Sequence, residues 1–156
     1  MGFFNIYQYA APLIILPLSY WLWLQRCGDE HRLAALMLAI PVLYAYIVPA
    51  VGTNVLRIWE FNTRLRLGRF RPHHGFVFGS ATSLIALAVL PPGMAGPWEM
   101  LRAGFVLGSV LAFWNWFYDV EALRAGFLRV YTRSYAEQRG PEAIAMDYAP
   151  PIFGLF

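Results

Sequence analysis

Three groups of polar residues in this sequence have the types and spacing needed for chemistry. In the first, Glu60 follows Arg57 by three residues and precedes Arg64 by four, so a helix over residues 53–64 would bring the three side chains to one edge. Ionisable groups near membrane depth tend to mark function, which would make Glu60 a proton acceptor or a substrate anchor. A local ion triad on an interfacial helix explains the same residues. The two cations favour the charged carboxylate, which argues against a general acid.

The second group is the most basic stretch of the chain, which ends in two adjacent histidines. Its candidate lipid- or anion-binding residues are Arg64, Arg66, Arg69, Arg71, His73 and His74. Each basic side chain near an anionic leaflet adds about 1 kcal/mol of binding, although the same cluster can serve only to fix topology. Adjacent histidines do not share a metal from a regular helix, where the useful spacing is i, i+4, so we expect no metal site.

The third group places Asp119 and Glu121 directly after an aromatic run, with Asn115 just before them. Two carboxylates near the histidines could form an acid–base site for a lipid-soluble substrate. If the protein is an enzyme, the candidate catalytic residues are Glu60, His73, His74, Asp119 and Glu121. The alternative is that Asp119 and Glu121 only complement the dipole at the start of a helix, with Glu121 paired to Arg124.

Aromatic residues make up 17% of the chain. The candidates for packing or for ligand contact are Trp59, Trp114, Trp116 and Tyr118. Such density suits a flat ligand, and we consider a lipid, a quinone, a carotenoid or a chlorin as possible cofactors. Aromatic belts at the membrane surface and ordinary helix packing explain the same residues equally well.

The composition indicates the class of fold that positions these three groups of polar residues. Hydrophobic residues make up 59% of the 156 residues and charged residues only 13%, about half the charge of a soluble domain. A domain this small cannot bury so much apolar surface, so we expect lipid around it. The sequence predicts a single all-α domain over residues 1–156, an integral membrane four-helix bundle with a C-terminal interfacial amphipathic helix. The expected segments are spans at 7–24, 33–52, 75–90 and 100–118, an amphipathic helix at 119–138 and an extended tail at 140–156.

The positive charges predict the orientation. All twelve basic residues are arginine, and with four spans nine of them fall on the side of both termini and three on the other. By the positive-inside rule both termini are cytoplasmic, and we expect a bacterial inner membrane. The single Cys27 excludes an intrachain disulfide.

Two functions remain open at this point. Kinked spans with small-residue stripes favour a non-catalytic subunit or accessory protein of a larger membrane complex, with energy-transducing complexes as the best match. Its partners would be membrane lipids and other transmembrane subunits, and not nucleic acid, because the arginine cluster lies between spans. The alternative is an enzyme acting on a lipid or isoprenoid at the cytoplasmic face. Convergence of the two histidines with Asp119 and Glu121 around one pocket would favour the enzyme.

Overall fold

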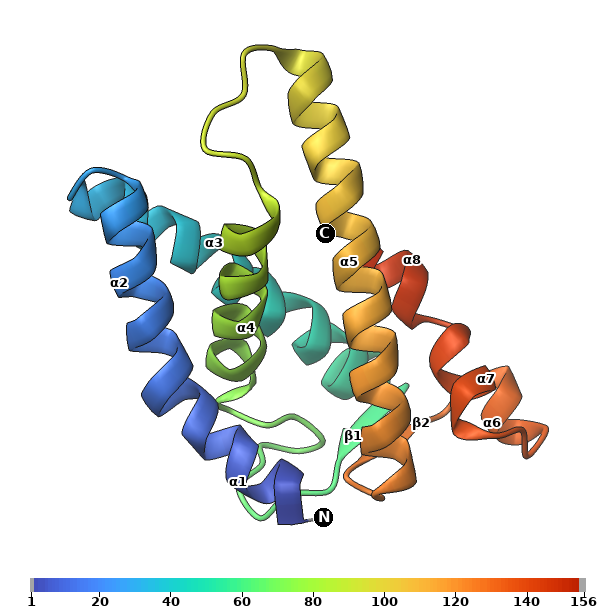
Figure 1. Ribbon diagram of the computed structural model, residues 1–156. Helices are drawn as coiled ribbons and strands as arrows, with labels where there is room; N and C mark the ends of the chain where they lie inside the picture. The colour runs from blue at the N-terminus through green and yellow to red at the C-terminus, as the bar shows by residue number, and fades with distance from the viewer. Residues whose placement is uncertain (1, 155–156) are drawn as a thin grey trace.

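The computed structural model describes residues 2–154, and helices dominate this part of the chain (Figure 1). The helices are α1 (Gly2–Ala10), η1 (Ala11–Ile15), α2 (Leu16–Arg26), α3 (His31–Ala50), η2 (Val51–Val55), α4 (His74–Val89), α5 (Pro97–Arg124), α6 (Arg133–Ala136), α7 (Pro141–Met146) and α8 (Ala149–Gly154). Two short strands, β1 (Trp59–Phe61) and β2 (Leu128–Val130), pair antiparallel. The all-α class is therefore confirmed.

Two of the described helices are long and apolar enough to cross a membrane, the continuous helix His31–Val55 and α5. Helix α4 is apolar but has only 16 residues. The N-terminal helices α1, η1 and α2 follow one another without a break. The wide π-helical turns of η1 begin next to Pro12, whose missing N–H leaves a helical hydrogen bond unmade. Two candidate spans are thus found where the sequence predicts four.

Helices α3 and α4 pack with their backbones in close contact. A Cβ atom on Gly79 would overlap the Cα of Val42 and lie 2.7 Å from its backbone nitrogen. A Cβ on Gly75 would meet the ring of Tyr46, at 2.6 Å from its Cγ. Glycine at these two positions of α4 therefore permits the close approach of the two helices.

The segment 53–64 is not the amphipathic helix that its periodicity predicts. Helical structure ends at Val55, Arg57 adopts a left-handed φ of 57°, and the chain then forms β1. The partner of β1 is β2, with Glu60 opposite Arg129 in the register. Strand alternation buries Trp59 and Phe61 and turns Glu60 outward.

The predicted helix at 119–138 is also wrong. Helix α5 continues to Arg124, Gly126 adopts a left-handed φ of 68°, and the chain turns back into β2 before the short helix α6. The tail expected to be extended contains α7 and α8. Its last two residues, 155–156, lie outside the described part.

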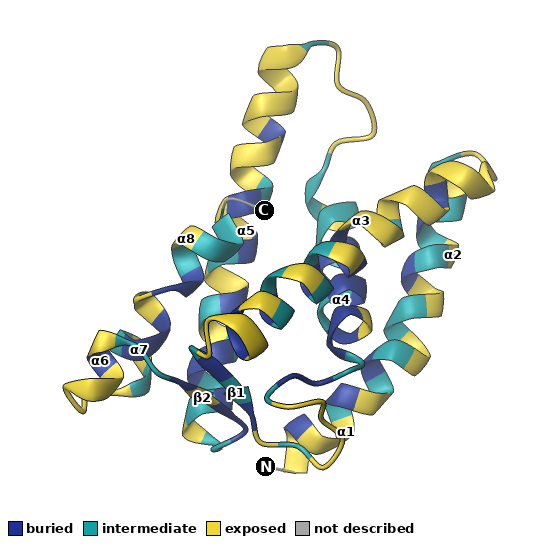
Figure 2. Ribbon diagram, turned by 180° about the vertical axis from the view of Figure 1, so that it is seen from behind, coloured by how far each residue is buried: buried dark blue, intermediate teal, exposed yellow. Residues whose placement is uncertain are grey.

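The hydrophobic core lies at one end of the molecule, where α1, the two paired strands β1 and β2, α7 and α8 pack around the C-terminal half of α5 (Figure 2). Its aromatic members include Phe4, Trp59, Phe61, Phe127 and Tyr148. The N-terminal half of α5 instead projects from the body and is almost wholly exposed (Figures 1 and 2). The core end therefore holds the segments that carry the candidate site.

Candidate functional site: a buried polar cluster

His74 and Asp119 line the same small cavity. His74 is the first residue of α4 and Asp119 lies in the C-terminal half of α5, and both are buried. The cavity has a volume of about 20 Å³, enough for about one water molecule. Its other walls are Pro49, Trp59, Phe61, Phe78, Leu128, Tyr148 and Phe153. An acid–base pair thus shares an apolar, aromatic chamber.

Asp119 is held in place by a tyrosine from the C-terminal segment. The Tyr148 hydroxyl donates a hydrogen bond of 2.6 Å to Oδ2 of Asp119. Burial, reinforced by the carboxylate of Asp119, raises the pKa of Tyr148 well above its ordinary value, so this hydroxyl stays a donor. Oδ1 of Asp119 takes no part in this bond.

The tautomer of His74 follows from its neighbour Arg71. Nη2 of Arg71 lies 3.1 Å from Nδ1 of His74, and a guanidinium can only donate. Nδ1 is therefore the acceptor, and a neutral His74 carries its proton on Nε2. The ring is fixed by stacking on Phe78, with centroids 4.5 Å apart, and by Phe61 at 4.8 Å.

A second cavity of about 20 Å³ adjoins the first and shares His74, Phe78, Pro49 and Phe153 with it. It adds polar side chains from three helices: Tyr44, Thr82 and Asn115. The Asn115 side chain donates back to the Leu111 carbonyl oxygen at 2.9 Å. The sequence places Asn115 near Asp119, and the structure adds that both border His74.

Arg71 is completely buried behind His74, at 0% exposure. Its guanidinium carbon lies 5.1–5.7 Å from the ring centroids of Phe61, Phe78 and Phe127. Burial lowers the pKa of Arg71, and the nearby hydroxyl of Tyr118 opposes this shift. Arg71 and His74 do not lie on the surface, so they differ from the surface lipid-binding residues predicted for this stretch.

His73 points away from His74. Its Nε2 lies 3.2 Å from Oε1 of Gln8, which also accepts from Thr63 at 3.0 Å, and its ring stacks on Tyr9. Desolvation, followed by the positive charge of Arg71, lowers the pKa of His73 to about 4. His73 does not converge with Asp119.

The depressed pKa of His73 predicts that acid destabilises the fold. The unfolded histidine has a pKa near 6.5. Stability from keeping His73 neutral is therefore fully present above pH ~6.5 and is lost as the pH falls towards about 4. We expect the melting temperature of the purified protein to fall between pH 7 and pH 5, and His73→Gln to reduce that fall. Equal pH dependence in His31→Gln and His73→Gln would contradict this assignment.

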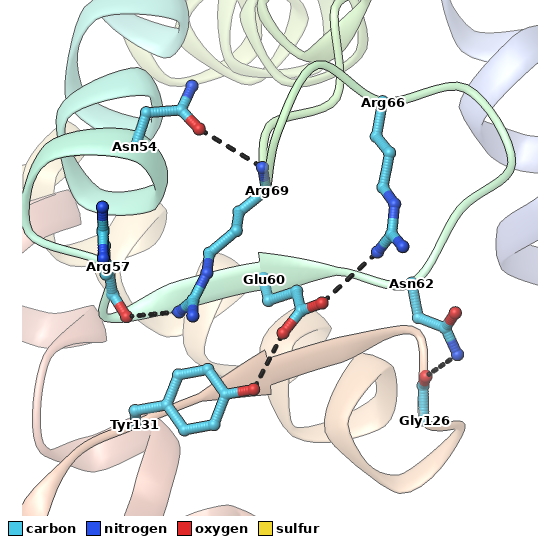
Figure 3. Close-up of polar contacts among 8 residues, drawn as sticks. All are labelled: Asn54, Arg57, Glu60, Asn62, Arg66, Arg69, Gly126 and Tyr131. Atoms are coloured by element: carbon cyan, nitrogen blue, oxygen red, sulfur yellow. Dashed lines mark hydrogen bonds and ion pairs between the residues drawn. The ribbon is translucent and has the colours of Figure 1, made fainter.

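Glu60 lies on the outer face of the two-stranded sheet, as Figure 3 shows. It pairs with Arg66 at 3.3 Å and accepts a hydrogen bond of 2.8 Å from the Tyr131 hydroxyl. The expected triad with Arg57 and Arg64 does not form, because a strand replaces the helix. Arg69 instead donates to the Arg57 carbonyl oxygen at 3.0 Å. Glu60 therefore belongs to a surface network and not to the buried cluster.

Glu121 is also outside the cluster. It accepts a hydrogen bond of 2.5 Å from Arg124, the pairing expected from the sequence, and Arg124 also pairs with Glu142. These side chains are about half exposed. An exposed pair of this kind contributes little to stability.

The remaining candidates have different surroundings. Arg64 and Arg66 are exposed and Arg69 is partly so. Trp59 is buried in the core, Trp114 is 52% exposed, and Trp116 is half-buried. Tyr118 packs edge-on against Phe4 and Phe78. Of these aromatics, Trp59 lines the cavity directly.

Tyr148 and the burial of Arg71 are the parts of the cluster that sequence reasoning missed. Tyr148 follows Asp147 and precedes Pro150 in a segment without periodicity, so nothing local marks it. Arg71 looks like the other arginines of its loop. Within residues 2–154, no three histidine, cysteine, aspartate or glutamate side chains are grouped so as to hold a metal ion.

Comparison with known protein families, with curated proteins and with solved structures finds no match for this chain.

Proposed function

We propose that this protein is a membrane enzyme that carries out acid–base chemistry on the polar end of a lipid-soluble substrate, such as a lipid or an isoprenoid. His74 and Asp119 are the reacting pair. The observation that carries this proposal is that both side chains, from different helices, line one buried cavity. Buried ionisable groups in apolar surroundings are costly to fold and cluster at functional sites.

The proposed setting is a membrane crossed by four helical segments: residues 2–26, 31–55, 74–89 and 97–124. Large apolar side chains that face outward along them support this arrangement, among them Leu13, Ile40, Ile47 and Phe105. Both termini and the Arg57–His74 loop would lie in the cytoplasm of a bacterial cell, on the side where most arginines gather. The His74–Asp119 cavity then lies near the cytoplasmic boundary.

In this reaction each residue has a distinct task. His74 presents Nε2–H to the substrate, because Arg71 occupies Nδ1. Asp119, oriented by Tyr148, presents its second oxygen as the proton acceptor. The aromatic walls exclude bulk water, which strengthens both interactions. Asn115, from the adjoining cavity, offers an amide oxygen for orienting a substrate hydroxyl.

Isotope exchange tests this function even while the substrate is unidentified. We would incubate the purified protein in lipid nanodiscs containing a total lipid extract, with D₂O or H₂¹⁸O as solvent, and follow label entry by mass spectrometry. We expect one class of lipid-soluble molecule to take up label. Asp119→Asn should slow uptake by a factor of about 100 or more, as for loss of a general base.

The matched control is Glu121→Gln, which alters an exposed carboxylate two residues away and should leave uptake unchanged. The proposal fails if the wild-type protein labels no species, or if Asp119→Asn labels as fast as the wild type.

A second function is favoured by the N-terminal half of α5. Trp98, Leu101 and Phe105 are 62–79% exposed on a helix that stands clear of the other helices (Figure 1). Such a surface suits contact with transmembrane subunits of a larger complex, or with a bound lipid, quinone, carotenoid or chlorin. In this case the protein is a non-catalytic subunit or accessory protein. Extraction from native membranes in mild detergent, followed by native mass measurement, would show a stoichiometric complex or pigment; an isolated chain would exclude this function.

A further inference from the structure

The cavity that His74 and Asp119 line has the size of a single water molecule. Its volume is about 20 Å³. A space of about 10–15 Å³ or more holds one water when two to four polar groups surround it, whereas an apolar space stays dry. Three polar residues line this cavity, and His74, Asp119 and Trp59 are each only 4–5% exposed. The polar atoms of these three side chains therefore decide what the cavity holds.

Trp59 carries a donor that has no partner among residues 2–154. Its indole Nε1 is buried without a hydrogen bond, and an indole N–H can only donate. The opposite side of the ring, at Cε3 and Cζ3, packs on Gly52 so closely that a Cβ atom there would overlap it. A buried donor left unpaired costs free energy, so an acceptor next to Nε1 would stabilise the fold. The cavity that Trp59 lines is the place for this acceptor.

His74 and Asp119 add a second donor and an acceptor. Because Nδ1 of His74 accepts from Arg71, the ring carries its proton on Nε2. Asp119 accepts the Tyr148 bond of 2.6 Å on Oδ2, and Oδ1 takes no part in that bond. The ring of Tyr148 also packs against Trp59, with centroids 5.4 Å apart. Two donors and one acceptor, from β1, α4 and α5, thus gather on one cavity.

We propose that this cavity binds one ordered water molecule, which bridges Trp59, His74 and Asp119. The water oxygen accepts from Nε1–H of Trp59 and from Nε2–H of His74, and one water proton is donated to Oδ1 of Asp119. Three hydrogen bonds are typical of a buried water. This site goes beyond the proposed function, because the water binds whether or not His74 and Asp119 react. Trp59 is then a positioning residue, which acts on the pair through the water.

Nuclear magnetic resonance of the Trp59 indole tests the proposal. The sample is the purified full chain in detergent micelles, labelled with ¹⁵N at tryptophan and dissolved in ordinary water. We expect a cross-peak between the Trp59 indole proton and water, with opposite signs in NOE and ROE spectra, as for a water that stays bound while the protein tumbles. Trp59→Phe assigns the signal by removing it. A Trp59 indole proton without this cross-peak would overturn the proposal.

Trp23 is the matched control in the same spectra. It is also buried, at 5% exposed, but its Nε1 donates to Oγ of Ser83 at 2.8 Å. Hydroxyl protons exchange with water and can relay such a signal, so the comparison uses Tyr148→Phe for Trp59 and Ser83→Ala for Trp23. The Trp59 cross-peak should persist in its variant, and Trp23 should show none. Loss of the Trp59 cross-peak in Tyr148→Phe, or an equal one from Trp23, would refute a specific water site.

Substitution of Asp119 tests the acceptor. Asp119→Leu replaces the carboxylate with methyl groups, so the cross-peak should disappear and the Trp59 indole proton should move upfield, while the Trp23 signal stays. Asp119→Asn keeps an oxygen at this position and should keep the cross-peak. A cross-peak unchanged in Asp119→Leu would contradict the proposed bridge.

A crystal structure of the wild-type protein at about 2 Å decides the question even where Asp119→Leu does not fold. We expect density for one oxygen atom within about 3.2 Å of Nε1 of Trp59, Nε2 of His74 and Oδ1 of Asp119. The lack of such density would overturn the proposal.

Discussion

Gly79→Ala is expected to cost about 3 kcal/mol or more of folding free energy, the upper end of the range for overpacking. The added methyl group would overlap the Cα of Val42, and a backbone atom cannot rotate away as a side chain can. Helices α3 and α4 would have to separate, and His74, the first residue of α4, would then shift relative to Asp119 on α5. The melting temperature in detergent, followed by circular dichroism, should fall by many degrees.

Gly104→Ala is the control for this change. Gly104 lies within α5, where a Cβ atom would meet nothing within 4 Å, so the substitution tests helix propensity alone. It should be neutral or stabilising by up to about 1 kcal/mol. If both variants melt like the wild type, the close approach of α3 and α4 is wrong.

Phe127→Ala should destabilise the core end of the molecule by about 3–5 kcal/mol. Phe127 is 0% exposed, stacks on Phe4 with centroids 5.3 Å apart, and presents its ring to Arg71. The substitution thus opens a cavity and also removes one of the three aromatic faces around a buried cation. Denaturant titration of the purified protein measures the loss.

Phe105→Ala provides the comparison, since Phe105 is 77% exposed on the projecting half of α5. We expect a change within about 0.5 kcal/mol. A similar loss for both phenylalanines would mean that the projecting half of α5 is buried against something, as expected for a subunit of a complex.

Hydropathy predicts well where the apolar helices lie along the chain. It predicts poorly the structure of the segments between and after them. The expected spans at 33–52 and 75–90 lie within a few residues of the helices His31–Val55 and α4. The pairing of β1 with β2 was missed because the two strands are far apart in sequence, and periodicity in a local window cannot report such a pairing. The local sequence pattern alone favours a helix for both segments. They form strands because the two pair with each other in the folded chain.

Only part of the candidate site was predicted, because its residues come from segments that are distant in the sequence. His74 and Asp119 are expected on the same side of the membrane from the order of the spans, and they do share a cavity. Arg71 belongs to a run of arginines that looks like a charged surface loop. Arg71 is buried because aromatic rings from three separate segments surround it. The local sequence around residue 71 does not predict these contacts.

In the proposed membrane setting, the unequal lengths of α4 and α5 have a consequence for how each helix meets the bilayer. At 1.5 Å per residue, the 28 residues of α5 extend about 42 Å, whereas the 16 residues of α4 extend about 24 Å. The hydrocarbon layer is about 30 Å thick, so in a membrane the two helices are mismatched in opposite directions. We expect α5 to tilt or to emerge from the layer. Helix α4, which packs among α2, α3 and α5, would be completed by its neighbours and not by lipid.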